Sequence, residues 1–113
     1  MELVAIEGEQ LSAVTFVQDY VQLHFDGPTL TTITRPTVIA GDASWEYGTL
    51  GYRDRLCELI GLVVLRASVR PGDRLQIDFA DGKSVSVSLR PEAYRAGEAV
   101  IFSDGDTEQW ACW

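Results

Sequence analysis

The strongest constraint on the fold of this chain is a pair of alternating polar and apolar segments, each reversing at an Asp-Gly turn. In residues 74–89, apolar side chains occupy every second position on both sides of Ala80-Asp81-Gly82-Lys83. Successive side chains of a strand point to opposite faces, so this period of two predicts two paired strands with one buried face. Glycine tolerates the positive φ that a tight hairpin turn needs, so the Asp-Gly pair predicts where the chain reverses.

A second hairpin is predicted upstream and resembles the first. Residues 20–25 alternate, Asp26-Gly27-Pro28 forms the turn, and residues 29–34 return as a β-branched strand. The threonines of this return strand predict an edge or a more exposed strand. Both return strands end in Arg-Pro, and an apolar run precedes each hairpin, at residues 11–17 and 62–69.

The two units predict a mainly β fold (α+β with one short helix), in which two similar β-hairpin units form a small sandwich or barrel. A length of 113 residues suits a single domain, 1–113. An internal repeat is predicted over 11–40 and 62–97, with one extra residue in the second hairpin. Two copies are too few for a solenoid, so each sheet is expected to cover the other.

The one helix is predicted at residues 52–60. Tyr52, Leu56, Leu59 and Ile60 fall on one apolar stripe, and Gly61 is placed as its C-terminal cap. Shorter signals predict a loop over 41–51, one helical turn over 91–95, a strand over 99–102 and a last strand over 110–113.

Charge and composition restrict the partners. The formal net charge is −8, from 17 acidic and 9 basic groups, which disfavours nucleic acid and anionic membranes and would attract a basic protein. No apolar run of membrane-spanning length occurs, and residues 1–10 lack the pattern of a secretory signal. Cys57 and Cys112 are few and far apart, which favours free thiols and a cytoplasmic protein.

No catalytic, cofactor or metal pattern is specific. His24 is the one histidine, too few for a zinc site with two distant cysteines. The carboxylates of 103–108 alternate but lack the rest of a calcium loop, which favours an acidic turn. Asp73, Asp78 and Asp81 are interpreted as surface groups rather than as a hydrolytic pair. No glycine-rich phosphate motif is present, so the chain is expected to lack a cofactor and to be a binding protein rather than an enzyme.

Three segments carry a resemblance to a known group of proteins: residues 19–25 (Asp-Tyr-Val-Gln-Leu-His-Phe), 56–61 (Leu-Cys-Glu-Leu-Ile-Gly), and 75–82 followed by 98–102 (Glu-Ala-Val-Ile-Phe). They resemble small bacterial proteins of uncharacterised family, some of them encoded near toxin genes and regarded as candidate immunity proteins. The resemblance implies a β-rich single domain and carries no catalytic residues.

The leading hypothesis is a non-enzymatic acidic module that binds a protein. Aromatic residues beside acids on a loop are typical of contact surfaces, and the predicted loop holds Asp42, Trp45, Glu46 and Tyr47. As an immunity-type inhibitor of a basic toxin, the chain would cover a basic active site with Asp42, Trp45 and Glu46. The plainer interpretation of Trp45 is a lid folded onto the core.

Two alternatives stay open. A pocket between the sheets could bind a small molecule or serve an enzyme, with Arg35 and Arg90, at matching places in the two units, holding an anion. The threonine-rich strand at 29–34 could instead pair with a second copy and form a homodimer.

Overall fold

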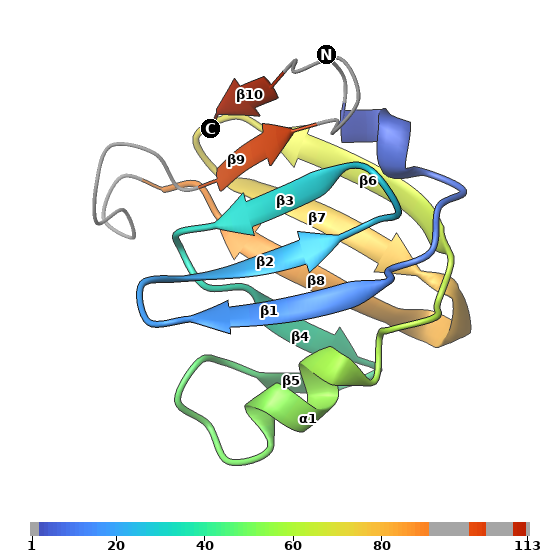
Figure 1. The fold of residues 1–113 in the computed structure, drawn as a ribbon. Coiled ribbons are helices and arrows are strands. Elements are labelled where there is room, and N and C mark those ends of the chain that lie inside the picture. The colour runs from blue at the N-terminus through green and yellow to red at the C-terminus, as the bar shows by residue number, and fades with distance from the viewer. Residues whose placement is uncertain (1–2, 91–99, 104–109, 113) are drawn as a thin grey trace.

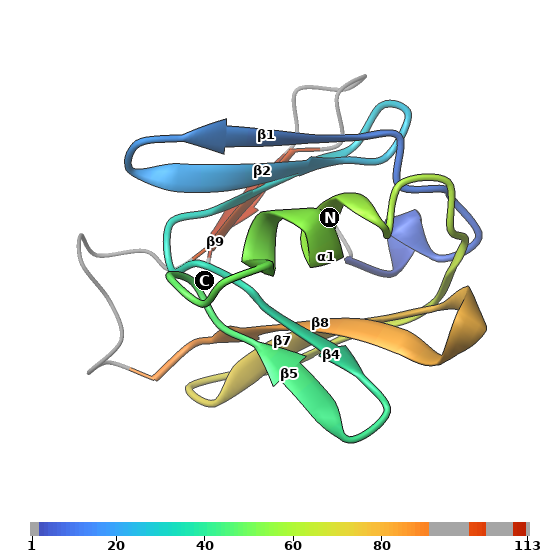
Figure 2. The ribbon, with the colours of Figure 1, turned by 90° about the horizontal axis from the view of Figure 1, so that it is seen from below.

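The computed structural model describes residues 3–90, 100–103 and 110–112, and it shows two antiparallel five-stranded sheets packed face to face (Figures 1 and 2). The predicted mainly β fold with two similar hairpin units is confirmed. The first sheet has the order β1 (Ala13–Val17), β2 (Tyr20–His24), β3 (Thr29–Thr32), β9 (Val100–Ser103) and β10 (Trp110–Cys112). The second has the order β5 (Ala43–Trp45), β4 (Thr37–Ala40), β8 (Lys83–Ser88), β7 (Arg74–Phe79) and β6 (Val64–Arg70).

The two halves of the chain exchange strands. Each half begins with three antiparallel neighbouring strands, β1-β2-β3 or β6-β7-β8. The next hairpin of each half, β4-β5 or β9-β10, belongs to the sheet of the other half. As a result β4 pairs with β8, while β9 pairs with β3. Each sheet therefore contains strands from both halves of the chain. Neither half forms a complete sheet from its own strands.

A reciprocal set of backbone hydrogen bonds joins the halves where they first meet. Gln10 and Val63 form an antiparallel bridge between the segments that enter β1 and β6. Every bond from one segment has a counterpart from the other, which gives this junction local two-fold character. The bonds run from Leu11 N–H to the Leu62 carbonyl (3.1 Å), from Val64 N–H to the Glu9 carbonyl (2.8 Å), from Gly61 N–H to the Leu11 carbonyl (2.7 Å) and from Gly8 N–H to the Val64 carbonyl (2.8 Å).

Two short helices pack against the edges of the sheets. The helix α1 (Tyr52–Cys57) contacts β1 and β4, and Figure 2 shows it between the two layers. The 3₁₀ turn η1 (Leu3–Ile6) contacts β6 in the other half. A second 3₁₀ turn, η2 (Ala80–Gly82), reverses the chain between β7 and β8, with Asp81 at φ +71° and Gly82 at φ +72° as the Asp-Gly signal predicts.

The buried apolar side chains of both sheets form one cluster with those of η1 and α1. Among the fully buried side chains of this cluster, the largest are Phe25, Phe79 and Phe102. Side chains along a strand alternate between the two faces of the sheet, and the inward ones are apolar, for example Leu75, Ile77 and Phe79 in β7.

The predicted helix is too long. The structure ends α1 at Cys57, and the chain continues to Gly61 in turns closed by Leu59 N–H to the Leu56 carbonyl and Ile60 N–H to the Cys57 carbonyl. These three-residue turns rotate the chain by about 120° per residue rather than about 100°. Leu59 therefore stays buried while Ile60, expected in the apolar stripe, turns out to be exposed.

The expected edge position of residues 29–34 is wrong, because β3 lies between β2 and β9. Burial alternates along β3 with a period of two, so that Leu30 and Thr32 are buried. Thr32 is tolerated inside because its hydroxyl donates to the Val21 carbonyl at 2.8 Å. Edge-to-edge dimerisation through this strand is therefore ruled out.

The predicted loop at 41–51 contains a strand, β5, which forms a hairpin with β4 through a turn at Gly41 and Asp42. The strands expected at 99–102 and 110–113 are present as β9 and β10. The helical turn at 91–95 and most of the acidic turn at 103–108 lie outside the described residues. Among the helices of the described ranges, none has the length and apolar character needed to cross a membrane.

Candidate functional site

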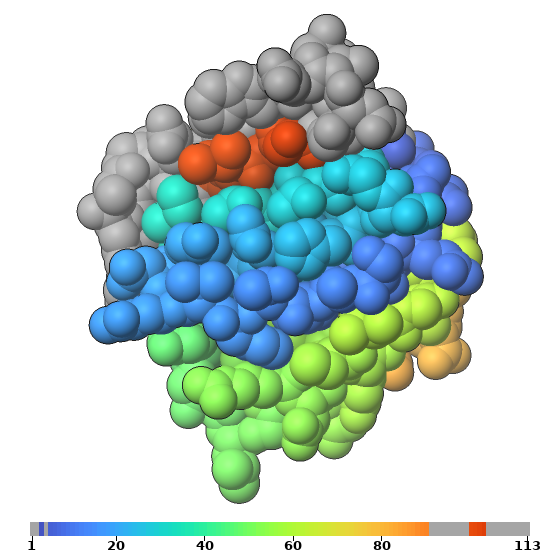
Figure 3. Space-filling view, viewed as in Figure 1, coloured from blue at the N-terminus to red at the C-terminus, as the bar shows by residue number. Residues whose placement is uncertain are grey.

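A groove runs along the seam where β1 and its turn into β2 face the segment leading into α1. We call it the seam groove, and Figure 3 shows the blue surface of β1 meeting the green surface of this segment. One part is a cleft of about 300 Å³ and the next a cleft of about 410 Å³, and the two share Tyr47, Tyr52 and Arg53. The other side chains that matter here are Phe16 and Val17 from β1, Arg35 from the β3–β4 connection, and Leu50.

Arg35 organises the centre of the groove. Its Nη2 donates to the Gln18 carbonyl in the β1–β2 turn, and its guanidinium lies 4.2 Å from the centre of the Tyr47 ring. The Tyr47 ring in turn meets Tyr52 edge to face, with centroids 5.9 Å apart. One guanidinium therefore connects the β1–β2 turn to the segment before α1.

Tyr52 anchors this cluster to the core. The side chain is buried, and its hydroxyl donates to the Pro36 carbonyl at 2.6 Å. Burial raises the pKa of the Tyr52 phenol well above its ordinary value, and the positive charge of Arg35 opposes part of that shift. Tyr52 is therefore a neutral hydrogen-bond donor at physiological pH.

Replacing Tyr52 with phenylalanine should change how stability depends on pH. The unfolded phenol ionises near pH 10, whereas the raised pKa keeps the folded phenol protonated to higher pH. The unfolded state then binds fewer protons, so the wild-type free energy of unfolding falls above about pH 10, by up to about 1.4 kcal/mol per pH unit. In Tyr52→Phe the free energy of unfolding should not show this fall at high pH. At neutral pH it should be about 1 kcal/mol lower than in the wild type, because the Pro36 carbonyl loses a donor.

Urea denaturation of both proteins between about pH 8 and about pH 11 checks this expectation. The difference between the two free energies cancels the titration of the other side chains. It should shrink as the pH rises, and a difference that stays constant would contradict the assignment.

The groove gathers exposed apolar surface. Leu50 is 96% exposed, Tyr47 55%, Val17 38% and Phe16 37%. In the described part of the chain, the only other exposed large apolar residues are Ile60 and Leu65, which line neither cleft. Arg53 lies 5.8 Å from the centre of the Phe16 ring, so a second guanidinium holds an aromatic ring of the groove.

The four predicted contact residues have different environments. Tyr47 lies at the centre of the groove, and Glu46 beside it is exposed. Asp42 is exposed in the β4–β5 turn. Trp45 is half-buried against the core, with the Arg55 guanidinium 4.7 Å from its ring centre, so it serves as the lid that was the plainer interpretation.

Arg35 and Arg90 are not brought together in this groove. Arg90 is absent from the residues that line it and pairs with Asp73 instead, with Nη2 and Oδ1 3.2 Å apart. Each of the two arginines donates a hydrogen bond to the turn that precedes the hairpin of its own unit. Arg35 donates to the backbone carbonyl of Gln18, whereas Arg90 donates to the carboxylate of Asp73. The structure therefore does not assemble a site from the two matching arginines.

The remaining candidates are occupied by ordinary contacts. His24 lies between two threonine hydroxyls, with Nε2 2.9 Å from Thr15 Oγ1 and Nδ1 3.3 Å from Thr29 Oγ1. Asp81 lies in the η2 turn, 3.9 Å from Lys83 Nζ. Cys57 is an exposed free thiol. Over the described residues, no group of three or more His, Cys, Asp or Glu side chains is placed to hold a metal ion.

Sequence reasoning missed Phe16, Leu50 and Arg53. Phe16 and Val17 lie in the apolar run that precedes the first hairpin, and they are exposed because β1 is an edge strand whose end is only partly covered. Leu50 carried a usable signal, since it is a lone large apolar residue between Thr49 and Gly51 in a segment with no period.

No protein-family model, curated protein or solved structure matches the chain. The resemblance to immunity-type families therefore stays a prediction. A fold alone does not imply a function, so the function has to be argued from the geometry of the site.

Proposed function

We propose that the protein is a non-enzymatic protein-binding module whose partner docks on the seam groove. The observation that carries the proposal is the gathering of Phe16, Val17, Tyr47 and Leu50 in one groove, while the described part of the chain exposes few other large apolar side chains. Contiguous exposed apolar surface is typical of protein contact sites.

The composition of the groove matches that of interface centres. Tyrosine, phenylalanine and arginine are enriched at such centres, and they contribute much of the binding energy when a partner covers them. Arg35 and Arg53 already hold the rings of Tyr47 and Phe16 in the free protein. Less side-chain entropy is therefore lost on binding than for free aromatic side chains.

Charge around the groove favours a basic partner. Glu46 and Asp54 flank Tyr47 and Arg53 in the chain and are exposed. The chain as a whole carries a net charge of −8, which raises the association rate of a positively charged protein at low salt. An immunity-type inhibitor of a basic toxin fits this chemistry.

Removing the exposed apolar groups of the groove should abolish partner capture. Immobilised wild-type protein and Tyr47→Ser/Leu50→Ser would be exposed to lysate at low and moderate salt, and bound proteins quantified by mass spectrometry. We expect a basic partner on the wild type, weakened by salt, with capture at least about tenfold lower on the variant.

The matched control is Ile60→Ser/Leu65→Ser, which also removes two exposed apolar side chains but outside the groove. Circular dichroism should show the same fold for all three proteins. Equal capture by the wild type and the groove variant would overturn the proposal, as would equal loss on the control.

A second candidate function is binding of a small carboxylate or other anion in the same groove. The observation that favours it is Arg35 Nε, which is buried and has no hydrogen-bond partner among the described residues. Arg35 lines the cleft of about 300 Å³, so a rotation of its side chain toward an anion bound there would give Nε a partner. A ligand-induced rise in melting temperature that Arg35→Gln abolishes would favour this function over protein binding.

A further inference from the structure

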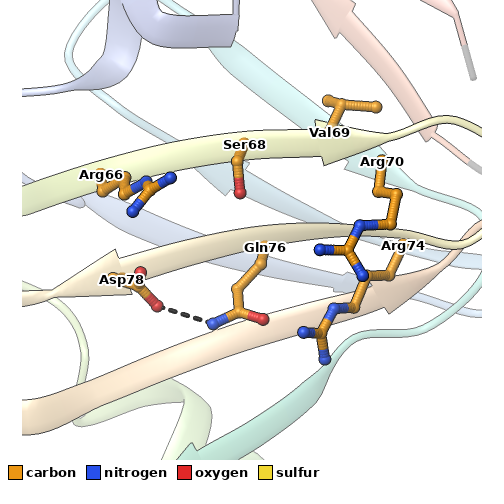
Figure 4. A pocket seen from close by; sticks show the side chains of 7 residues that line it. All are labelled: Arg66, Ser68, Val69, Arg70, Arg74, Gln76 and Asp78. Atoms are coloured by element: carbon orange, nitrogen blue, oxygen red, sulfur yellow. Dashed lines mark hydrogen bonds between the residues drawn. The ribbon is translucent and has the colours of Figure 1, made fainter.

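The outer face of β6 and β7 concentrates positive charge on an otherwise acidic protein. Arg66 and Arg70 point outward from β6, and Arg74 points outward from β7 (Figure 4). With Ser68, Gln76 and Asp78 they line a shallow pocket of about 310 Å³, which we call the arginine face. It holds three of the chain's nine basic residues.

Strand pairing places two of these charges directly opposite each other. Arg70 is the register partner of Arg74, and Figure 4 shows their guanidinium groups side by side at one end of the pocket. Like charges opposite each other across two strands destabilise the pairing. An anion lying between them would convert this repulsion into two attractive contacts.

Nearby carboxylates neutralise the positive charges of the arginine face only in part. Asp73 lies 3.6 Å from Arg70 and 3.2 Å from Arg90, so one carboxylate is shared by two guanidiniums. Asp78 accepts a hydrogen bond from Gln76 at 2.9 Å and lies opposite Arg66 at the other end of the pocket. Within the described ranges, neither Arg66 nor Arg74 has an ion-pair partner.

We propose that the arginine face binds a small soluble anion with two or more linked phosphate groups. The Arg70–Arg74 end offers two planar guanidinium forks, a geometry suited to phosphate oxygens. Ser68 and Gln76 provide neutral donors between this end and Arg66, so a chain of phosphates can meet donors along its length.

The size and surroundings of the pocket favour this ligand over a polymer. The pocket is confined to two strands, and it has no aromatic lining on which a base could stack. A long nucleic acid or an anionic membrane would also meet the field of a chain with net charge −8. A compact polyphosphate contacts the arginine face with little exposure to the rest of the surface.

The test is isothermal titration at low salt with inorganic tripolyphosphate, pyrophosphate and orthophosphate. We expect affinity to rise in the order of charge, with tripolyphosphate at least about tenfold tighter than orthophosphate. Arg74→Gln should weaken tripolyphosphate binding about tenfold. Arg66→Gln should have a smaller effect, because Asp78 already offsets part of its charge.

The matched control is Arg55→Gln, which makes the same charge change outside both the arginine face and the seam groove and should alter binding less than about twofold. Arg74→Gln removes a like-charge contact, so its melting temperature should not fall and misfolding cannot mimic the result. Absence of binding by the wild type, or equal weakening by Arg55→Gln, would overturn the proposal. A single-stranded oligonucleotide that binds more tightly than tripolyphosphate, and is equally sensitive to Arg74→Gln, would overturn the assignment to a small anion.

Discussion

Phe25→Ala and Phe79→Ala should each lower the free energy of unfolding by about 3–5 kcal/mol, as truncation of a buried phenylalanine does. Both rings are almost fully buried in the common core, one just after β2 and the other at the end of β7. Each truncation removes apolar burial and leaves a cavity that the surrounding strands only partly fill. The loss is a large fraction of the about 5–15 kcal/mol expected for a whole domain.

Urea denaturation followed by tryptophan fluorescence and by far-ultraviolet circular dichroism measures both losses. Phe16→Ala is the matched control, since it truncates the same residue type in the exposed groove and should cost less than about 1 kcal/mol. Because the sheets share one core, both optical signals should change in a single transition for every variant. Two separate transitions in Phe25→Ala would show that the sheets unfold independently.

The hairpins could be predicted from sequence because their signals are local. An Asp-Gly pair between alternating runs determines the turn, the register and the buried face together, and this holds for β7 and β8. The exchange of hairpins between sheets has no such signal. The four residues of β4 pair with β8 rather than with β3, and that choice depends on contacts far apart in the chain.

Tertiary contacts also determine how the predicted site residues are arranged. Tyr47 was a candidate from its loop position, and Arg35 from its place at a strand end. Their stacking could not be foreseen, because it requires α1 to lie beside β1. Arg35 and Arg90 match in sequence but differ in structure, since Gln18 offers a carbonyl to one and Asp73 a carboxylate to the other.

The arginine face could have been found once the β6–β7 hairpin was recognised. Arg66 and Arg70 are four positions apart, which places them on one side of a strand. Pro71-Gly72 then reverses the chain and places Arg74 opposite Arg70. The apolar residues of 62–69 supply the buried face of β6, so the arginines of the same strand lie on its exposed face.

Cutting the chain between Leu50 and Gly51 should yield two fragments that do not fold alone but fold together. This cut falls in an exposed connection and separates β1–β5 from β6–β10. Alone, each fragment loses the partner of its exchanged hairpin and leaves the apolar face of its first three strands uncovered. Circular dichroism and thermal melting should show no cooperative transition for either fragment and a cooperative one for the equimolar mixture.

The melting temperature of the mixture should rise with concentration, because folding is then coupled to association. The intact chain is the control, and its melting temperature should not depend on concentration if the exchange occurs within one molecule. A fragment that melts cooperatively as a monomer would contradict the expectation, since it would have formed a closed core without its exchanged partners. Because β4 and β9 each lie between strands of both halves, the exchange accounts for how two short units cooperate in one folded structure.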